Sequence, residues 1–510
     1  MTGKSVLSNF IWRLAERSGA QIVQLVVSIV LARLLAPTDY GVVALMNVFI
    51  SILGIFINCG LGTALIQKKD SDNVDFSTVF YAQLAFCGVI YTGLFIAAPF
   101  IAEFYNMPEM TPMVRVLSFT LVIAAVKNVQ VSYVSKNMQF KRFFFATLGG
   151  TIGAAGVGIG MACLGFGAWA LIAQSLFNNA VDTLILWITV KWRPIKAFSF
   201  KRLKGLFSYA WKLLVSSLLD TVYNNLRSLI IGKVYSAQDL AFYNKGKSWP
   251  NMIVENVNSS IDSVLLPSMS SVQDNRESVK SMTRRAIKTS TYIMAPIMMI
   301  FAFCGTPLVR LILTEKWLPL VPFQIIFCIT YIFYPVHTAN LNAIKALGRS
   351  DLFLKLEIIK KIIGLLALAV TVPISVMAMG YSLLFTGLTS QIINTWPNKK
   401  LLNYGYIEQL KDILPGILLA VAMGCCIYPI QWIGLPDIVT LCIQVPLGAV
   451  IYIGGSKLFK LESFEYLLGL VKPVLKKIKK KIEKGDVCGF RYLLCRWAWR
   501  YSIRTCSRIE

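Results

Sequence analysis

The feature that most limits the fold of this chain is a series of long apolar stretches separated by short polar segments. A helix needs about 20 mostly apolar residues to cross the hydrocarbon core of a bilayer. Because backbone polar groups have no water partners there, such stretches form helices that satisfy their own hydrogen bonds. The sequence therefore predicts an all-α integral membrane protein with 14 spans, near 10–34, 40–63, 77–101, 112–134, 143–164, 168–190, 205–232, 243–267, 287–313, 319–342, 353–376, 381–396, 412–430 and 437–455.

Composition agrees with a membrane protein and narrows its partners. Hydrophobic residues make up 56% of the chain and charged residues only 15%. Lys and Arg outnumber Asp and Glu by 51 to 25, which in a membrane protein indicates cytoplasmic loops and anionic lipid headgroups rather than nucleic acid. The 11 Cys show no Cys-x-x-Cys spacing, so neither a disulfide framework nor a zinc site is expected.

A turn near the start of the chain occurs a second time. Ser28 to Gly41 is matched, 200 positions later, by Ser228 to Ala241. Later landmarks also correspond, since Lys136 to Phe144 resembles Lys345 to Phe353. The first twelve spans thus divide into two six-helix lobes of the same orientation. We expect a pseudo-two-fold axis along the membrane normal to relate the lobes, with two C-terminal helices added.

This repeat gives the expected domain organisation. The divisions are 1–200 for the N-terminal lobe, 201–404 for the C-terminal lobe, 405–456 for spans 13 and 14, and 457–510 for a basic tail. The tail alternates apolar and lysine positions at helical spacing from Val471 to Lys481. It is typical of an amphipathic helix on the inner leaflet, and regulation or partner binding is the alternative.

The distribution of basic loops predicts the orientation. Loops after the even-numbered spans are basic, whereas those after spans 3, 5, 11 and 13 contain no Lys or Arg. Basic loops stay in the cytoplasm, so both termini are expected there. The exceptions lie on the expected outward side and need a separate explanation; they are Arg33, Lys233, Lys245 and Lys247 of the repeated turn, with Arg310 and Lys316.

Polar residues recur at helical spacing inside several spans, where they are costly. The stripes are Asn9, Arg13, Arg17, Gln21, Gln24 and Ser28 on span 1; Asn47, Ser51 and Asn58 on span 2; Lys212, Ser216, Asp220, Asn224 and Arg227 on span 7; and Asn251, Glu255, Asn258 and Asp262 on span 8. Together they favour a water-filled cavity between the lobes. The alternative is that they lock the bundle by pairing, Asp220 with Arg227 for example.

Weaker signals have structural alternatives. Asp182 shares a face of span 6 with Gln174 and Asn178, and His337 is either packed or a proton relay. The glycines of span 5 indicate close helix packing, with a hinge as the alternative.

Enzyme signatures are missing from the sequence. Gly246-Lys247-Ser248 ends like a phosphate loop, but Ala241 stands where its first glycine belongs and no strand precedes it. No metal-binding cluster, no nucleophile beside a base and no large outward domain is found. The chain therefore reads as a transporter without a cofactor, driven by an ion gradient or by downhill flow of its substrate.

Four motifs between residues 33 and 109 carry a family resemblance, and those in the first hundred positions are the most specific. They are Arg33-Leu34-Leu35-Ala36-Pro37-Thr38-Asp39-Tyr40-Gly41, Ala64-Leu65-Ile66-Gln67-Lys68-Lys69, Asp75-Phe76-Ser77-Thr78-Val79-Phe80 and Phe104-Tyr105-Asn106-Met107-Pro108-Glu109. The chain resembles Wzx-type oligosaccharide flippases of the MOP (multidrug/oligosaccharidyl-lipid/polysaccharide) exporter superfamily over residues 5–455. The tail after 457 lies outside this resemblance.

The resemblance implies a cargo and roles for the stripes. The cargo would be an undecaprenyl-pyrophosphate-linked oligosaccharide, moved from the cytoplasmic to the outer leaflet of the bacterial inner membrane for surface polysaccharide synthesis. Arg13, Arg17, Lys212 and Arg227 would pair with phosphate oxygens. Amide side chains would form hydrogen bonds with the sugar hydroxyls. The amides are Gln21, Gln24, Asn47, Asn224, Asn251 and Asn258. Arg33, Lys233 and Lys245 would receive the pyrophosphate on the outward side.

Coupling and partners complete these expectations. Glu16, Asp220, Glu255 and Asp262 are candidates to take up H+ or Na+ and couple the cycle to a gradient. Membrane lipids and polysaccharide polymerase machinery are the further partners, and a monomer is expected. A drug or organic-cation antiporter of the same superfamily is the runner-up, with a cavity dominated by carboxylates and aromatics. A polymerase or glycosyltransferase needs a sizeable outward loop, and a scaffold would have no use for buried charge.

Overall fold

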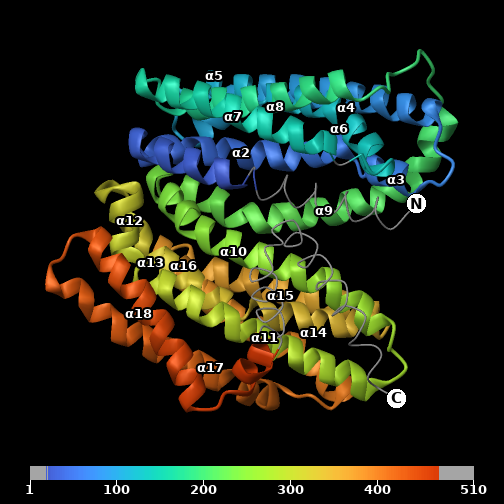
Figure 1. The fold of residues 1–510 in the computed structure, drawn as a ribbon. Coiled ribbons are helices and arrows are strands. Elements are labelled where there is room, and N and C mark those ends of the chain that lie inside the picture. The colour runs from blue at the N-terminus through green and yellow to red at the C-terminus, as the bar shows by residue number, and fades with distance from the viewer. Residues whose placement is uncertain (1–18, 20, 140, 470–471, 473–510) are drawn as a thin grey trace, which may run out of the picture. The chain divides into compact units, whose positions relative to one another are not determined.

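The computed structural model describes residues 19, 21–139, 141–469 and 472. The predictions for Asn9, Arg13, Glu16 and Arg17, and for the tail beyond residue 472, lie outside these residues. Every regular element in the described part of the chain is a helix, which confirms the predicted all-α class (Figure 1). The chain divides into two packing units.

The first unit comprises residues 1–244 with 312–317. Its helices are Gln21–Leu34, α2 (Pro37–Asn58), α3 (Leu61–Gln67), α4 (Asn73–Phe104), α5 (Met110–Leu117), α6 (Phe119–Lys136), α7 (Lys141–Cys163), α8 (Ala168–Thr189) and α9 (Phe200–Val234). The second unit comprises 245–311 and 318–510. Its elements are most of α10 (Ala237–Ser270), α11 (Arg276–Phe303), most of α12 (Gly305–Leu313), part of the 3-10 helix η1 (Glu315–Leu320), α13 (Val321–Tyr331), α14 (Tyr334–Ala346), α15 (Ser350–Thr371), α16 (Val376–Leu402), α17 (Tyr406–Ile427), η2 (Tyr428–Ile433) and α18 (Asp437–Leu458).

Ten helical stretches of the described chain are long and apolar enough to cross a membrane, so the protein is a multi-pass membrane protein. The other four expected spans coincide with Gln21–Leu34, α9, α10 and α15. Gln21–Leu34 is short, and the other three carry several charged residues. The 35 residues of α9 reach about 50 Å, which is enough to span a bilayer. The count of 14 spans stays a prediction.

The repeated turn has the same local structure in both copies. In each, a helix ends, two non-helical residues follow, and the next helix begins, at Pro37 in one copy and Ala237 in the other. A carboxylate two residues into the new helix holds each turn. Asp39 accepts a hydrogen bond from the Ala36 backbone at 3.0 Å, and Asp239 bonds the Ser236 hydroxyl at 2.6 Å.

The two copies of the turn pack against each other inside the first unit. A Cβ at Gly41 would lie 1.8 Å from the carbonyl oxygen of Ala237, and one at Gly232 would lie 2.2 Å from Leu45. These positions need glycine because the helices α2, α9 and α10 approach too closely for a side chain. This contact places α9 in the first packing unit, although the repeat begins its second copy with α9. The lobe boundaries at 200 and 404 stay a prediction.

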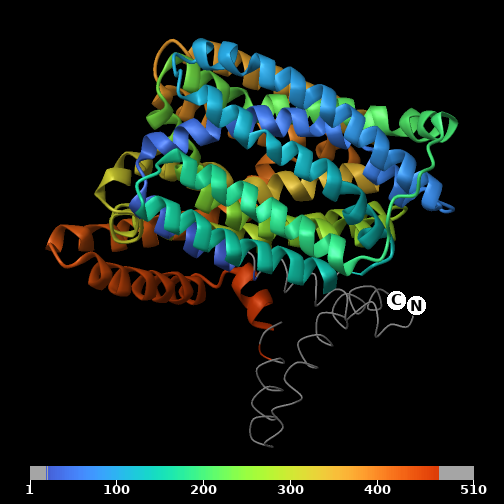
Figure 2. The ribbon, with the colours of Figure 1, turned by 90° about the horizontal axis from the view of Figure 1, so that it is seen from above.

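Glycines also let α7 lie close along α8, and the two helices run side by side in both views (Figures 1 and 2). A Cβ at Gly153 would lie 2.7 Å from the Phe177 ring, and one at Gly150 would lie 3.0 Å from the Asn178 carbonyl. This contact agrees with the packing interpretation of the glycine-rich span.

Aromatic residues build the core at one end of the first unit. The rings of Phe76 and Phe80 lie 5.9 and 6.2 Å from that of Trp192, which follows α8. Gln130 donates to the Trp192 carbonyl at 3.2 Å, so the connection from α8 to α9 is tied to α4 and α6. The start of α9 is thereby fixed beside α3 and α4.

Candidate functional site

The polar stripes of α2 and α9 are exposed faces of the first unit. On α2, Asn47, Ser51 and Asn58 are exposed. On α9, the exposed members are Lys212, Ser216, Asp220 and Asn224, while Arg227 is half-buried. Gln24 of the helix before α2 is exposed and Gln21 half-buried. A helix face that carries amides, hydroxyls and both signs of charge requires water or a polar ligand rather than lipid tails.

The cations expected on the outward side have packing partners that the sequence did not reveal. Lys316 donates to the carbonyls of Arg33 and Leu35, each at 2.7 Å, and the Arg33 side chain donates to the Ile312 carbonyl at 2.8 Å. Trp317 donates to the Ala32 carbonyl at 2.8 Å. The last carbonyls of a helix have no partner within it, so Lys316 and Trp317 cap the helix that ends at Leu34, and Arg33 caps the end of α12.

Lys233 has a similar role at the end of α9. Its ammonium group donates to the Phe104 carbonyl and lies 4.2 Å from the centre of the Phe104 ring. Lys245, in the second unit, is half-buried. Cation contacts in the fold therefore explain Arg33, Lys233 and Lys316 as exceptions to the charge alternation. The assignment of Arg33, Lys233 and Lys245 to pyrophosphate stays a prediction.

The carboxylates of α10 in the second unit accept hydrogen bonds from amides. Asn251 donates to Glu255 at 2.7 Å, and Tyr331 donates to Asn251 at 3.3 Å. Asn342 of α14 donates to Asp262 at 2.7 Å. An amide donor orients a carboxylate without cancelling its charge. The candidate amide Asn258 is half-buried on the same helix.

An ion pair inside the first unit was missed by the sequence analysis. Lys127 of α6 lies 3.0 Å from Asp182 of α8, and its ammonium group also contacts Asn179 at 3.4 Å. The two side chains are 19% and 18% exposed. The sequence contains a sign of this pair, because Lys127 and Asp182 are charged residues inside the apolar spans 4 and 6. Only the fold shows that they meet.

A buried amide network in the second unit was also missed. Gln409 exchanges hydrogen bonds with Asn340 at 2.8 and 2.9 Å, and Asn398 donates to Asn340 at 2.6 Å. All three are fully buried. Nearby, Asn394 contacts the His337 ring at 3.1 Å, so the lone histidine has a neutral partner.

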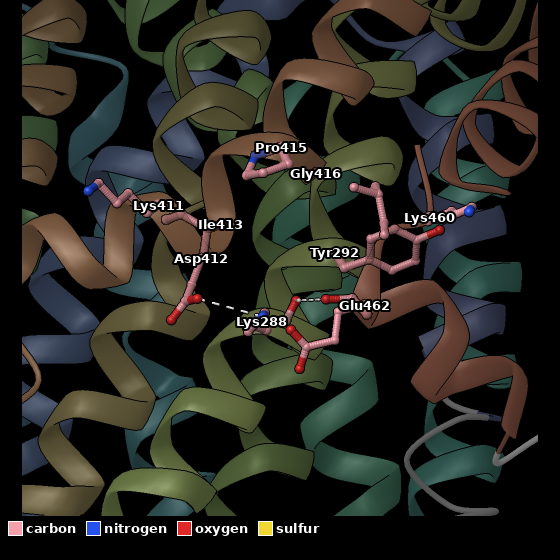
Figure 3. A pocket seen from close by; sticks show the side chains of 11 residues that line it. Lys288, Tyr292, Lys411, Asp412, Ile413, Pro415, Gly416, Lys460 and Glu462 are labelled. Atoms are coloured by element: carbon pink, nitrogen blue, oxygen red, sulfur yellow. Dashed lines mark hydrogen bonds and ion pairs between the residues drawn. The ribbon is translucent and has the colours of Figure 1, made fainter. Parts of the chain in front are cut away.

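A cavity of about 170 Å³ in the second unit lies between α11, α17 and the segment after α18 (Figure 3). Lys288 projects into it and pairs with Asp412, at 3.6 Å, and with Glu462. Arg284 also bonds Asp412, at 2.7 Å. The deepest charges of this cavity therefore compensate one another. No group of three His, Cys, Asp or Glu that would hold a metal ion occurs in the residues that the structure describes.

Comparisons with known proteins agree with this arrangement. The polysaccharide biosynthesis protein family matches residues 30–322. The succinoglycan biosynthesis transport protein ExoT of Rhizobium meliloti is 24% identical over 62% of this chain, and the match spans 64% of ExoT. The teichuronic acid biosynthesis protein TuaB of Bacillus subtilis is 21% identical, over 88% of this chain and 95% of TuaB. The lipopolysaccharide biosynthesis protein WzxC of Escherichia coli is 22% identical, over 72% of this chain and 74% of WzxC.

Solved structures with the same fold are transporters. The lipid II flippase MurJ, in an inward closed conformation, has a TM-score of 0.69 at 15% identity, with 88% of this chain and 98% of MurJ covered. An inward-facing multidrug resistance transporter of the MATE family in the MOP superfamily has a TM-score of 0.58 at 15% identity, with 77% and 98% covered. The chain belongs to the polysaccharide biosynthesis protein family, with the Wzx-type flippases of the MOP exporter superfamily, and this is a family of membrane transporters and not of enzymes.

Proposed function

We propose that this protein moves undecaprenyl-pyrophosphate-linked oligosaccharide units from the cytoplasmic to the outer leaflet of the bacterial inner membrane. The product would serve the synthesis of a surface polysaccharide such as a capsule, an exopolysaccharide or an O-antigen. The names of ExoT, TuaB and WzxC, each concerned with the biosynthesis or transport of a surface polymer, support this cargo class.

The exposed face of α9 is the observation that carries the proposal. Lys212 and Asn224 are exposed on it, and Arg227 is half-buried on the same stripe. A lipid-linked sugar presents a pyrophosphate and many hydroxyls beside an apolar tail. Cations bind phosphate oxygens through charge-assisted hydrogen bonds, and amides serve hydroxyls as donor and acceptor. The cargo's polar head thereby exchanges its water for protein groups while its tail stays in the lipid.

Alternating access supplies the mechanism. Two lobes rock so that a cationic cavity opens first to the cytoplasmic side and then to the outward side. Asp220, Glu255, Asp262 and Glu16 are the carboxylates that would exchange H+ or Na+ with the gradient. Asp262 and Glu255 are held in fixed positions by amides of the second unit, which suits groups that must bind and release a small cation.

A multidrug or organic-cation antiporter is the second candidate. The carboxylates of α10 and the fold of the MATE transporter favour it. The cations of α9 make an organic-cation antiporter the less favoured candidate, because Lys212 and Arg227 would repel a cationic drug at close range. The matched relatives, named for polymer biosynthesis, also favour the lipid-linked sugar.

A vesicle assay tests the proposal on the two described cations. The protein is reconstituted with a fluorescent undecaprenyl-pyrophosphate oligosaccharide, and translocation is read as loss of headgroup protection. We expect the double substitution Lys212→Gln and Arg227→Gln to slow translocation by about 100-fold, since each charge-assisted bond contributes about 1.5–3 kcal/mol. Lys204→Gln, an exposed lysine at the start of the same helix, is the control and should retain the wild-type rate. An unchanged rate in the double variant would reject the cationic-cavity mechanism.

A further inference from the structure

A second cavity, of about 410 Å³, lies in the first unit between α3 and the first turns of α9. Ala64 of α3 and Gly205 and Leu206 of α9 form its apolar part. These small or aliphatic groups offer no hydrogen bond, so this part of the cavity suits hydrocarbon. No local pattern in the sequence predicts this cavity. From the sequence, Lys68 and Arg202 are expected only to be part of the basic cytoplasmic loops.

The rest of the cavity is polar, and each of its two cations is paired with a carboxylate. Lys68 and Arg202 line it, with side chains 40% and 38% exposed, and Gln67 and Tyr209 lie beside them. A guanidinium has five donors and an ammonium three, so each keeps donors for a further partner. One cavity therefore combines an apolar wall with two ion-paired cations that keep further hydrogen-bond donors.

Two carboxylates hold the cations in place. The fully buried Asp75 lies 2.6 Å from Lys68 and 3.3 Å from Arg202, and Asp72 forms a second bond to Arg202. Asp72 also caps α4 by accepting from the Asp75 backbone at 2.9 Å. The cations are thus preorganised by the start of α4, and no long side chain has to be ordered when an anion binds.

We propose that this cavity binds the phosphate or pyrophosphate head of a lipid and serves as the cytoplasmic loading subsite for the cargo. The inference rests on the proposed function and adds a named subsite to it. Lys68 and Arg202 would take the phosphate oxygens, and the first isoprenoid units would lie against Leu206 and Ala64. Lys68 follows α3 and Arg202 lies in the first turn of α9, and the charge alternation assigns both segments to the cytoplasmic side.

Two lipids offer this chemistry, the polyprenyl-pyrophosphate cargo and the anionic phospholipids of the bilayer. The apolar wall distinguishes either from free phosphate or pyrophosphate. The pair of cations favours the doubly charged pyrophosphate over a phosphodiester with a single charge, because both phosphoryl groups can be paired at once.

Binding to the purified full-length protein tests the subsite, with farnesyl pyrophosphate as the probe. We expect Arg202→Gln to weaken binding at least tenfold. Asp72→Asn keeps the helix cap and removes one of the two negative charges that face Arg202, while Asp75 still holds the guanidinium in place. Binding of the anion should therefore stay unchanged or become tighter. Lys204→Gln, a lysine two positions from Arg202 that does not line the cavity, should bind as the wild type does.

Each alternative has a distinct result. If Asp72→Asn loses binding as severely as Arg202→Gln, the ion pair is only structural and the subsite is wrong. If inorganic pyrophosphate binds as tightly as farnesyl pyrophosphate, the apolar wall plays no part and the lipid assignment is wrong. If phosphatidylglycerol competes equally well, the cavity is a general lipid site and the loading role is overturned.

Transport separates this inference from the proposed function. In the vesicle assay, Arg202→Gln should raise the cargo concentration for half-maximal rate about tenfold and leave the maximal rate within twofold. A wild-type protein that binds farnesyl pyrophosphate here but translocates no lipid-linked sugar would reject the function and keep the binding site. A variant that lowers only the maximal rate would overturn the loading role.

Discussion

The two packing units place polar groups between corresponding helices but use different chemistry. In the first unit α6 and α8 are joined by the ion pair of Lys127 and Asp182. In the second, the corresponding helices α14 and α16 are joined by neutral groups, with Asn340 bonded to Asn398 and His337 to Asn394. This correspondence rests on the repeat predicted from the sequence, in which the end of α6 resembles that of α14 and Gly167 before α8 resembles Gly380 in α16.

The charged link of the first unit is also less buried than the neutral link of the second. The side chains of Lys127 and Asp182 remain 19% and 18% exposed, whereas Asn340, Asn398 and Gln409 are fully buried. Desolvating a charge costs far more than desolvating an amide that keeps its hydrogen bonds. The comparison teaches that the repeat preserves the need for a polar link between these helices, while the access of water determines whether ions or amides supply it.

The largest expected effect comes from breaking the ion pair on one side. Asp182→Leu leaves the Lys127 ammonium without its counter-charge and should lower the free energy of unfolding by about 3 kcal/mol. Thermal unfolding of the purified protein measures this. Adding Lys127→Met should restore most of the loss, because the two charges disappear together. A double variant as unstable as Asp182→Leu would show that the pair is not the linking element.

An intermediate effect is expected from the neutral network. Gln409→Leu removes one of the partners of Asn340, which keeps its bonds to Val336 and Asn398, and it leaves a buried amide hydrogen unsatisfied. The substitution should cost about 1–3 kcal/mol. In the same thermal unfolding measurement, Gln409→Leu should lose less free energy of unfolding than Asp182→Leu. Should Gln409→Leu prove the more destabilising of the two, the ordering of ionic and neutral links proposed here would be reversed.

The smallest effect concerns the pH dependence of the cation site near α4. The bond from Arg202, followed by the Asp75 backbone, lowers the pKa of Asp72 from its ordinary 3.8 to about 2. A lowered pKa stabilises the fold above the unfolded value, and this stabilisation is lost as the pH falls from about 4 to about 2. The side chain is half-exposed, so solvent screening keeps the effect small. Unfolding temperatures of the wild type and Asp72→Asn should differ by about one degree at pH 6, and the gap should narrow below pH 4.

Much of the fold could be predicted from the sequence, because apolar length and the spacing of the repeated turn are local signals. The all-α class and the two matching turns at Pro37 and Ala237 follow from them. The stripes on α2 and α9 were found for the same reason, since helical periodicity alone places Asn47 with Ser51 and Lys212 with Asp220.

Contacts between distant segments could not be found in this way. Lys316 meets the carbonyl of Arg33 across most of the chain, and Lys68 meets Arg202 around one cavity only after α3 and α9 have packed. Gln409 joins Asn340 without any periodic pattern. Pairing of this kind depends on the tertiary fold, and a single sequence carries no local sign of it.

Translocation of two cargoes in the same vesicles tests the central claim most directly. Wild-type protein is supplied with a fluorescent undecaprenyl-pyrophosphate oligosaccharide and with a fluorescent organic cation under an imposed ion gradient. The account predicts that the lipid-linked sugar crosses at a protein-dependent rate and that Lys212→Gln with Arg227→Gln abolishes most of it, while the organic cation stays outside. Accumulation of the cation, with no protein-dependent movement of the lipid-linked sugar, would contradict the account.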